Sequence, residues 1–350
     1  MRVIVTGGAG FIGSAACRQF VLAQGWTVLN LDKLTYAADV RSLDAVADHP
    51  GYRFLRADIC DRAAVESAFA DFAPDAVVHL AAETHVDRSI DGSAEFIRTN
   101  VIGTHVLLEA VRRFWSALPS DARGRFRFVH VSTDEVYGSL GEEGRFVETS
   151  PYDPRSPYAA SKAASDHLAR AWHQTYGLPV ILSNCSNNYG PCQFPEKLIP
   201  LTILNALEEK PLPVYGDGLH VRDWLYVDDH VEALSRVLTR GRPGQNYNVG
   251  GRSERTNLSV VETICDIVDD LLPASEPRRR LISFVEDRPG HDRRYAMDCA
   301  KVESELGWAC AESFEAGLRK TVRWYLDNRA WWEPLRRNVY AGKRLGLANV

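Results

Sequence analysis

The chain has 350 residues, of which 45% are hydrophobic and 25% charged, and its formal net charge is −5. This length and mixed composition predict a folded globular protein of one large domain or two lobes. The small acidic charge argues against a protein that binds nucleic acid or an anionic membrane surface. No uncharged apolar segment reaches the roughly 18 residues of a membrane span, and the N-terminus lacks the pattern of a secretory signal. We therefore expect a cytoplasmic location.

The cysteines and histidines give no sign of a disulfide framework or a metal site. The seven cysteines are scattered along the chain, at positions 17, 60, 185, 192, 265, 299 and 310, without a C-x-x-C pair. The ten histidines show no metal-ligand spacing. We expect reduced thiols and no metal.

Short strand-like segments alternate with longer helical segments in the first half of the chain. Apolar and β-branched runs predict strands at 2–7, 27–32, 52–58, 75–82 and 125–132, with amphipathic helices at 11–24, 62–72 and 93–115 between them. Near-continuous apolar strands that alternate with helices indicate a parallel sheet covered on both faces. The predicted fold class is α/β, with a Rossmann-type doubly wound parallel sheet.

The character of the sequence changes after about residue 190, where Pro, Gly and charged turns become denser. Helices are predicted near 197–209, 229–239, 258–272 and 312–327, and the aromatic tail at 324–340 predicts core or subunit packing. We expect a large domain over 1–190 and a smaller C-terminal α/β lobe over 191–350, with some exchange of chain between them. A cleft between two such lobes is the expected place for a ligand.

The stretch "VTGGAGFIG" at residues 5–13 follows the first predicted strand and opens the first helix. Gly7, Gly10 and Gly13 permit a tight turn and the close approach of a pyrophosphate to the helix N-terminus. Asp32 ends the second strand, where a carboxylate binds a ribose diol and repels a 2′-phosphate. The pattern predicts a domain that binds NAD rather than NADP. A glycine turn that only packs helix on strand is the alternative.

The second group of interest is Tyr158 and Lys162, four residues apart in a predicted helix. This spacing places both side chains on one helix face, and an ammonium near a phenol favours the phenolate. Ser132 or Thr133, at the end of the fifth strand, is expected to hydrogen-bond the substrate oxygen that Tyr158 deprotonates. Chance occurrences of Y-x-x-x-K are common, so the glycine loop carries part of this inference.

The predicted cofactor contacts come from the glycine loop and from the ends of later strands. Asp58 is expected at the adenine edge, although a strand-end cap is an equally good interpretation. The full predicted set is Gly7, Gly10, Phe11, Ile12, Gly13, Asp32, Lys33, Asp58, Ile59, Ala81, Thr84, Thr99, Tyr158, Lys162 and Cys185.

Together with the glycine loop and Y-x-x-x-K, several longer motifs resemble those of a known family. The sequence is similar to the extended short-chain dehydrogenase/reductase superfamily and, more specifically, resembles the dTDP-glucose 4,6-dehydratases from residue 1 to about 330. The motifs are "ETHVDRS" (83–89), "TDEVYG" (133–138), "NCSNNYGP" (184–191), "FPEKLIP" (194–200), "GDGLHVRDWLYVDDH" (216–230) and "DRPGHDRRYAMD" (287–298).

The resemblance implies an NAD-dependent enzyme that converts dTDP-glucose to dTDP-4-keto-6-deoxyglucose. In such a reaction C4 is oxidised, water leaves across C5 and C6, and the same hydride returns to C6. The implied catalytic residues are Thr133, Asp134, Glu135, Tyr158 and Lys162, with Tyr158 as base at the 4-hydroxyl, Glu135 as base at C5 and Asp134 as acid at the 6-hydroxyl. Consecutive strand residues face opposite ways, so Asp134 and Glu135 meet one sugar only if the strand has ended by residue 134.

The resemblance also implies a pocket for the nucleoside diphosphate and a homodimer. Arg suits phosphate through its fork of donors. The implied substrate contacts are Thr84, Asn187, Lys197, Leu198, Pro213, Tyr215, Arg222, Asn257, Arg288, His291 and Tyr340. The helix predicted at 156–174 carries apolar residues around much of its circumference, which fits a dimer of paired helices.

Three other functions stay open at this point. A dehydratase of UDP-sugars or other nucleotide sugars would share all of this chemistry. A C4 epimerase would share Tyr158 and Lys162 but would not need the acid pair. A non-catalytic NAD-binding sensor would be expected to lose Tyr158 or Lys162, and both are present.

Overall fold

A seven-stranded parallel sheet forms the centre of the larger lobe in this computed structural model, which describes residues 1–340, 342 and 345. The strand order is β10-β6-β5-β4-β1-β2-β3. The strands are β1 (Arg2–Thr6), β2 (Thr27–Asp32), β3 (Tyr52–Arg56), β4 (Ala76–His79), β5 (Arg127–Thr133), β6 (Val180–Cys185) and β10 (Asn246–Val249). The central strands are buried on both faces, as their continuous apolar runs predict. The predicted fold class and the five predicted strands are confirmed.

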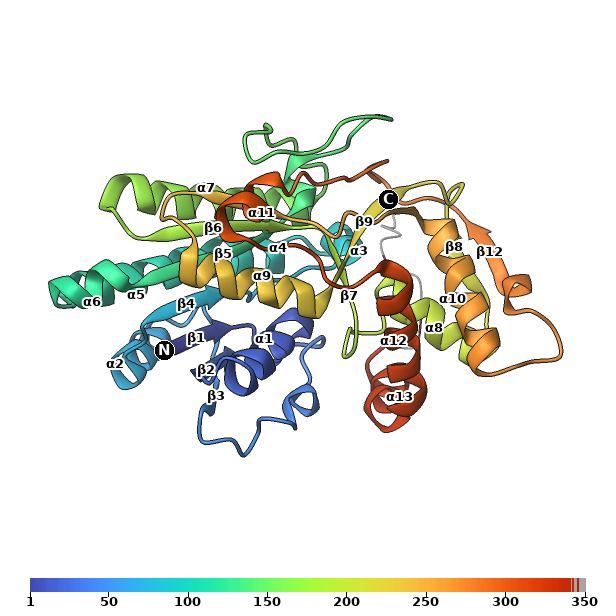
Figure 1. The fold of residues 1–350 in the computed structure, drawn as a ribbon, viewed down its shortest axis with the longest axis horizontal. Coiled ribbons are helices and arrows are strands. Elements are labelled where there is room, and N and C mark those ends of the chain that lie inside the picture. The colour runs from blue at the N-terminus through green and yellow to red at the C-terminus, as the bar shows by residue number, and fades with distance from the viewer. Residues whose placement is uncertain (341, 343–344, 346–350) are drawn as a thin grey trace.

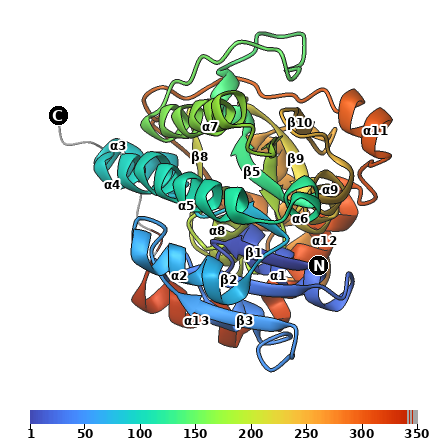
Figure 2. The same ribbon diagram turned by 90° about the vertical axis from the view of Figure 1, so that its left-hand side faces the viewer.

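Helices cover both faces of this sheet (Figures 1 and 2). One face carries α2 (Arg62–Phe72), α5 (Thr104–Ala117) and α7 (Pro157–Tyr176), and the other carries α1 (Phe11–Leu22) and α9 (Val227–Arg240). Separate apolar clusters fill the two interfaces, which include Leu107 and Phe128 on the first side and Phe20 and Val231 on the second. Burial of these clusters holds the sheet between its helical layers.

The order of the strands determines where a ligand can bind. β1 lies between β2 and β4, so the connections that leave β1 and β4 run to opposite sides of the sheet. In doubly wound sheets this arrangement opens a crevice at the carboxyl ends of the strands. The glycine loop after β1 and the ends of β4, β5 and β6 all meet there.

The smaller lobe lies on the right in Figure 1. It contains a three-stranded sheet in the order β11-β9-β7 and a parallel pair of β12 with β8. Its strands are β7 (Asn187–Tyr189), β8 (Leu212–Tyr215), β9 (Val221–Tyr226), β11 (Glu254–Thr256) and β12 (Ile282–Val285), and its helices are α8 (Leu198–Leu207), α10 (Asn257–Leu271), α12 (Phe314–Asp327) and α13 (Arg329–Asn338). In α13, Trp331 and Trp332 are buried in the core of this lobe, so the aromatic tail packs as a core element.

The chain crosses between the lobes more than once. After β7, α8, β8 and β9 of the smaller lobe the chain returns to the large sheet as α9 and β10, and α11 (Ala300–Leu306) packs against both. It then ends in the smaller lobe with α12 and α13. The domain boundary at residue 190 therefore stays a prediction. The chain passes between the lobes several times, and not only at that residue.

The helix α7 shows clear local signals at both ends. The hydroxyl of Ser156 accepts a hydrogen bond from Ala159 N at 3.0 Å, and Pro157 occupies the first turn. Gly177 ends the helix in the left-handed region, with φ of 70°. These signals fix the register that carries Tyr158 and Lys162.

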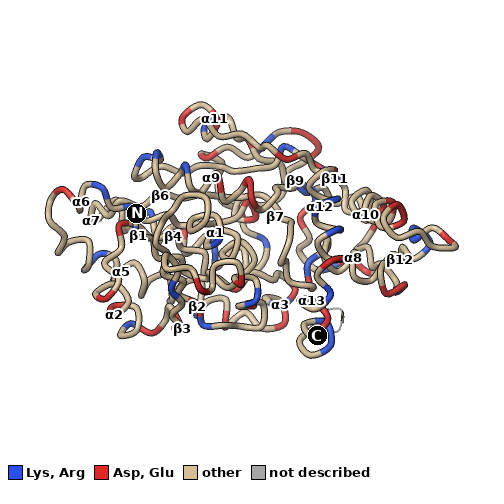
Figure 3. The backbone as a smooth tube through the Cα atoms, turned by 60° about the horizontal axis from the view of Figure 1, so that its bottom comes forward, with Lys and Arg blue, Asp and Glu red and all other residues tan. Residues whose placement is uncertain are grey.

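Several short helical elements complete the fold. They are η1 (Val40–Leu43), α3 (Val86–Asp91), α4 (Ala94–Phe96), η2 (Ile97–Gly103), α6 (Ser120–Arg125), η3 (Asp134–Tyr137) and η4 (Arg278–Leu281). The sequence predicts one helix over 93–115, whereas the structure divides that region into α4, a π-helical η2 and α5. Acidic and basic residues alternate along the backbone of both lobes in Figure 3. Among the described residues, no helix combines the length and apolar character that crossing a bilayer requires.

Candidate active site

A deep pocket lies at the carboxyl end of the large sheet. Its walls combine the glycine loop, the ends of β2, β4, β5 and β6, the first residues of α7 and the segment before α8. Most predicted cofactor and catalytic residues line it: Gly7, Gly10, Phe11, Ile12, Gly13, Asp32, Lys33, Ile59, Ala81, Thr84, Thr99, Thr133, Asp134, Glu135, Tyr158, Lys162 and Cys185, with Asn187 and Lys197 of the predicted substrate set. The fold thus gathers into one pocket residues that lie far apart in sequence.

The glycine loop has the close packing that its residues predict. Gly7 has φ of 73°, and a Cβ built on it would lie 2.7 Å from the Cα of Ala81. A Cβ on Gly13 would lie 2.0 Å from the carbonyl oxygen of Gly7. Only glycine keeps the first turn of α1 this close to the ends of β1 and β4, and this closeness is what a bound pyrophosphate requires.

Asp32 ends β2 at the edge of the pocket, and its side chain is 8% exposed. Its two oxygens accept hydrogen bonds from Ala9 N at 2.9 Å and from Leu34 N at 2.7 Å. These bonds hold the carboxylate beside the glycine loop, where a ribose diol would lie. Burial raises the pKa of Asp32, and the two backbone donors oppose that shift.

Asp58 has a different setting. One of its oxygens accepts a hydrogen bond from Cys60 N at 2.9 Å, and the other lies 3.7 Å from Lys33 Nζ. It does not line the pocket. The strand-end cap interpretation thus describes what Asp58 does within the protein, and its contact with an adenine stays a prediction.

The strand β5 ends at Thr133, and the 3₁₀ helix η3 begins at Asp134. The hydroxyl of Thr133 accepts a hydrogen bond from Glu135 N at 3.3 Å, which caps the helix. Because the chain has left the regular strand at this point, both Asp134 and Glu135 line the same pocket. The geometric condition set by the sequence is met.

The two carboxyl groups differ in their surroundings. Burial, with the neighbouring carboxyl groups of Glu135 and Asp223, raises the pKa of Asp134 well above its usual value. Burial also raises the pKa of Glu135, but the cations of Arg288, Lys197 and Arg222 oppose that shift. Asp134 is thus set to hold a proton, and its Oδ2 has no partner within the described part of the chain.

Tyr158 and Lys162 face the pocket from α7, and both are nearly buried. Burial and the carboxyl of Glu135 raise the pKa of the Tyr158 phenol, and a hydrogen bond with Thr133 lowers it. The ammonium of Lys162 donates to the carbonyl oxygen of Val131 at 2.8 Å. Ser132 faces elsewhere, since its hydroxyl donates to Asp166 at 2.8 Å. Of the two hydroxyls that the sequence offers, Thr133 is the one beside Tyr158.

The predicted diphosphate contacts come from the smaller lobe. Arg222 on β9 donates to the carbonyl oxygens of Val221 and Asp292, and its guanidinium lies 4.2 Å from the ring centre of Tyr295. Arg288 forms an ion pair with Asp87 at 3.2 Å. These contacts with other protein groups fix the positions of both guanidinium groups before a ligand binds.

Three further predicted substrate residues carry polar atoms without a partner in the described structure. They are Arg288 Nε, Asn187 Oδ1 and Asn257 Oδ1, all of them buried. Buried polar atoms are normally hydrogen-bonded, so these atoms are available to a ligand. Of the predicted substrate contacts, Thr84, Asn187 and Lys197 line the pocket. The others lie outside its wall, and they are Leu198, Pro213, Tyr215, Arg222, Asn257, Arg288, His291 and Tyr340.

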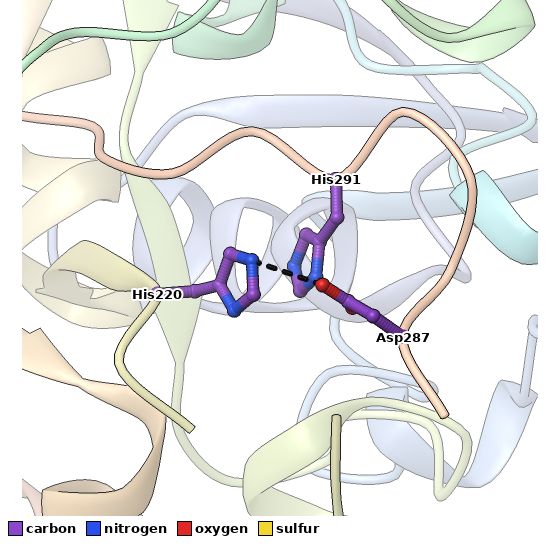
Figure 4. Close-up of side chains that lie close together, drawn as sticks. All are labelled: His220, Asp287 and His291. Carbon is purple, nitrogen blue, oxygen red and sulfur yellow. Dashed lines mark hydrogen bonds and ion pairs between the residues drawn. The ribbon is translucent and has the colours of Figure 1, made fainter. Parts of the chain in front are cut away.

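The loop that carries Arg288 also holds a cluster of His220, Asp287 and His291 (Figure 4). The Asp287 carboxylate lies 3.2 Å from His220 Nε2 and 2.7 Å from His291 Nδ1, and the two imidazole rings stack with centres 3.7 Å apart and planes 15° apart. A metal ion binds in the plane of an imidazole, and one ion cannot lie in both of two stacked planes. The geometry fits two imidazole N–H donors to one carboxylate, which fixes the loop.

The sequence analysis missed the residues that join the two lobes. Asp87 on α3 accepts from Tyr215 at 3.1 Å as well as from Arg288. Glu196 pairs with Arg88 at 2.8 Å and accepts from Tyr36 at 2.9 Å. Of these six residues, Tyr215 and Arg288 were predicted as substrate contacts. Asp87, Arg88 and Glu196 lie in the motifs "ETHVDRS" and "FPEKLIP", so the motifs pointed to the region, but the pairings need the fold.

Comparisons with known proteins identify the family. A family model described as GDP-mannose 4,6 dehydratase matches residues 4–321. A probable dTDP-glucose 4,6-dehydratase of Sinorhizobium fredii is 61% identical over 347 residues, which are 99% of each chain. The chain belongs to the dTDP-glucose 4,6-dehydratase family. The dTDP-glucose 4,6-dehydratase of Neisseria meningitidis serogroup B is 58% identical over 350 residues, again 99% of each chain.

Solved structures agree with this family membership. The dTDP-glucose 4,6-dehydratase of Streptomyces venezuelae, solved with NAD bound, has 47% identity and a TM-score of 0.88, covering 96% of this chain and 100% of its own. The UDP-glucose 4-epimerase of Thermus thermophilus, also solved with NAD, has 32% identity and a TM-score of 0.82, covering 94% of this chain and 100% of its own. Dehydratases and epimerases thus share this fold, and the site residues must distinguish them.

Proposed function

We propose that this chain, as a member of the dTDP-glucose 4,6-dehydratase family, converts dTDP-glucose to dTDP-4-keto-6-deoxyglucose. The observation that carries the proposal is the turn from β5 into η3, which gives Asp134 and Glu135 to the pocket that also holds Tyr158. Such a reaction moves protons at the 4-hydroxyl, at C5 and at the 6-hydroxyl. The pocket offers a separate group for each of these places.

Each group has a role that its surroundings support. The proposed role of Tyr158 is to accept the proton of the 4-hydroxyl. Burial and the Glu135 carboxyl raise the pKa of its phenol, and the hydrogen bond with Thr133 opposes that rise. Glu135 removes the C5 proton, which the new ketone at C4 makes acidic. Burial raises the pKa of Glu135, and the cations of Arg288, Lys197 and Arg222 oppose that rise. Asp134, whose pKa is raised by burial, delivers a proton to the departing 6-hydroxyl.

The glycine loop, Asp32 and Lys162 would hold NAD, which would supply the uptake of hydride from C4 and its return to C6. Because Gly7 and Gly13 have no Cβ, the glycine loop leaves space for the pyrophosphate of NAD. Asp32 lies beside this loop, where its carboxylate would bind a ribose diol. Lys162 lies at the wall of the pocket with its ammonium fixed on Val131, where it would hold a ribose hydroxyl.

The nucleotide sugar would bind between the lobes. Arg222 and Arg288 suit its diphosphate, with Asn187, Lys197, Asn257 and His291 beside them. The relatives named above support thymidine as the nucleoside. A UDP-sugar dehydratase is the closest alternative, because one methyl group separates thymine from uracil and is worth only about 1–3 kcal/mol in a hydrophobic pocket. The pair of Asp134 and Glu135 argues against an epimerase.

We also propose a homodimer that forms through α5 and α7. These helices pack together, and η2 packs against both of them. Ile97 and Ile102 of η2 and Tyr176 at the end of α7 face solvent, each 46–51% exposed. Trp172 stacks edge-on against His105 beside them, with ring centres 5.5 Å apart. An apolar strip along two paired helices suits the same strip of a second copy. A cytoplasmic location fits the cysteines, all seven of which are free thiols.

The test is incubation of the purified protein and NAD with dTDP-glucose in deuterated water, with the product read by NMR. We expect a 4-keto-6-deoxy sugar with deuterium at C5 and the original C4 hydrogen at C6. Unchanged dTDP-glucose alongside conversion of UDP-glucose would move the proposal to the other nucleotide, and a 4-epimer of the sugar would replace it with epimerase chemistry.

The same experiment tests the role of Glu135. Glu135→Gln keeps the shape of the side chain but removes the base, and a positioned base contributes about 10²–10⁴-fold to rate. We expect deuterium incorporation at C5 and turnover to slow by that order, while dTDP binds as before. A variant that turns over at the wild-type rate would remove Glu135 from the mechanism.

A further inference from the structure

The positive charge of Lys162 has few protein groups close by to balance it. Its side chain is buried, and its ammonium has one protein hydrogen bond in the described structure, to the carbonyl oxygen of Val131. A buried ammonium is costly unless a negative charge balances it. Burial lowers the pKa of Lys162, and Asp166 is the first of the charged groups that oppose this shift.

Asp166 lies one helical turn after Lys162 on α7, on the same face of the helix, and is fully buried. Its Oδ2 accepts hydrogen bonds from Ser132 Oγ and from Tyr152 OH, each at 2.8 Å, and its Oδ1 lies 3.0 Å from His130 Nε2. Burial alone would raise the pKa of Asp166. These hydrogen bonds and the nearby charges outweigh burial, so the pKa of Asp166 lies below its usual value. The carboxylate is therefore set up to stay ionised inside the protein.

The partners of Asp166 join three elements around the catalytic groups. Ser132 and His130 belong to β5, which also supplies the Val131 carbonyl that holds Lys162. Tyr152 lies in the segment before α7. The carboxylate thus connects the strand that leads to Asp134 and Glu135 with the helix that carries Tyr158 and Lys162.

We propose that Asp166 is a positioning residue, whose buried carboxylate balances the charge of Lys162 and fixes α7 against β5. It does not line the pocket and touches no substrate. The inference rests on the proposed function, since Lys162 matters to a reaction only there. Its physical core, the coupling of two buried charges, is independent of any reaction.

Other groups near Asp166 are polar or are separated from it by another side chain. Burial lowers the pKa of His130, so this imidazole is neutral near pH 7 and donates a hydrogen bond without adding charge. Arg170 lies 3.3 Å from the Tyr152 hydroxyl, and Tyr137, Cys185 and His79 also face the pair. Burial lowers the pKa of His79. Among the described neighbours, Lys162 is the cation that shares the buried face of α7 with Asp166.

A double-mutant cycle on thermal unfolding tests this coupling without catalysis. Asp166→Asn removes the negative charge and keeps the shape, and Lys162→Met removes the positive charge. We expect Asp166→Asn to lower the melting temperature of the otherwise unchanged protein, and to lower it by much less in the Lys162→Met background, where the carboxylate has lost its counter-charge. Equal losses in the two backgrounds would overturn the proposal, whether or not dTDP-glucose proves to be the substrate.

The pH profile of kcat provides the second readout. With Asp166→Asn, Lys162 loses its proton at lower pH, so the alkaline limb of the profile should move down by at least about one pH unit, as for loss of a close opposite charge. Tyr152→Phe is the control, because it removes one hydrogen bond from the carboxylate and keeps its charge, and its alkaline limb should stay in place. An unmoved limb in Asp166→Asn, or an equal shift in Tyr152→Phe, would show a role limited to packing.

Discussion

At the scale of single residues, Asp134 and Glu135 show how neighbours in sequence acquire different proton affinities. Both leave β5 at the same turn, and burial raises the pKa of both. At Asp134 the carboxyl groups of Glu135 and Asp223 add to this rise, whereas at Glu135 the cations of Arg288, Lys197 and Arg222 oppose it. The difference favours Asp134 as the group that holds a proton. A dehydration needs such a pair, whereas an epimerisation does not.

The raised pKa of Asp134 predicts a cost to stability that depends on pH. The unfolded residue releases its proton near pH ~3.9, and the folded residue holds it to higher pH. Between these two values the folded state binds more protons, so its stability falls as pH rises, by up to ~1.4 kcal/mol for each pH unit of this window. Asp134→Asn removes the titration, and we expect it to be more stable than the natural chain at pH 7 but not near pH 4.

Urea unfolding at a series of pH values checks this expectation. Asp121→Asn, at an exposed position in α6, is the matched control and should show no such growing difference. A difference between Asp134→Asn and the natural chain that stays constant from pH 4 to pH 8 would mean that Asp134 is charged in the folded protein.

At the scale of elements, the π-helical segment η2 positions side chains that a regular helix would turn away. Asn100 in η2 accepts from Glu83 N at 2.9 Å and donates to Glu83 O at 3.0 Å and to Ser161 Oγ at 2.8 Å. Thr99 beside it accepts from Lys33 at 3.1 Å. The segment thereby fastens the loop after β4 to α7, and π-helical turns often occur at functional sites.

Loss of the Asn100 side chain should weaken this connection. Asn100→Ala leaves the N–H and carbonyl of Glu83 without their partner, and we expect a loss of about 1–3 kcal/mol in the free energy of unfolding. Urea denaturation measures it, with Asn338→Ala at an exposed position in α13 as the control. A loss no larger than that of the control would show that the loop keeps its place without Asn100.

At the scale of the whole molecule, partly buried ion pairs join the two lobes. Asp87 and Arg88 of the larger lobe meet Arg288 and Glu196 from the second half of the chain. The apolar strip on η2, α5 and α7 lies on the larger lobe, and α3, which carries Asp87 and Arg88, packs against α7.

The proposed dimer predicts a simple change in mass. Ile102→Glu places a charge in the apolar strip, and a buried unpaired charge opposes association, so the variant should sediment as a monomer. Phe284→Glu is the control, because Phe284 is 58% exposed on β12 of the smaller lobe and should leave the dimer intact. If the two variants sediment alike, either the dimer forms through another surface or the protein does not form a dimer.

The sequence by itself determined the elements of this protein and most of its site. The apolar strands, the glycine loop, the four-residue spacing of Tyr158 and Lys162, and the acidic pair after β5 are local patterns, and local patterns follow from side-chain period and backbone sterics. They were enough to predict the doubly wound sheet and the groups that line its pocket.

Only the tertiary structure decided which groups meet. Two of these outcomes depend on where the strand ends: Asp134 and Glu135 line one pocket, and Thr133 rather than Ser132 lies beside Tyr158. Two others join segments that are distant in sequence: Asp87 pairs with Arg288, and Asp166 of α7 is buried against residues of β5. Proton affinities depend on burial and on charges a few ångströms away, and these are properties of the folded chain rather than of any stretch of sequence.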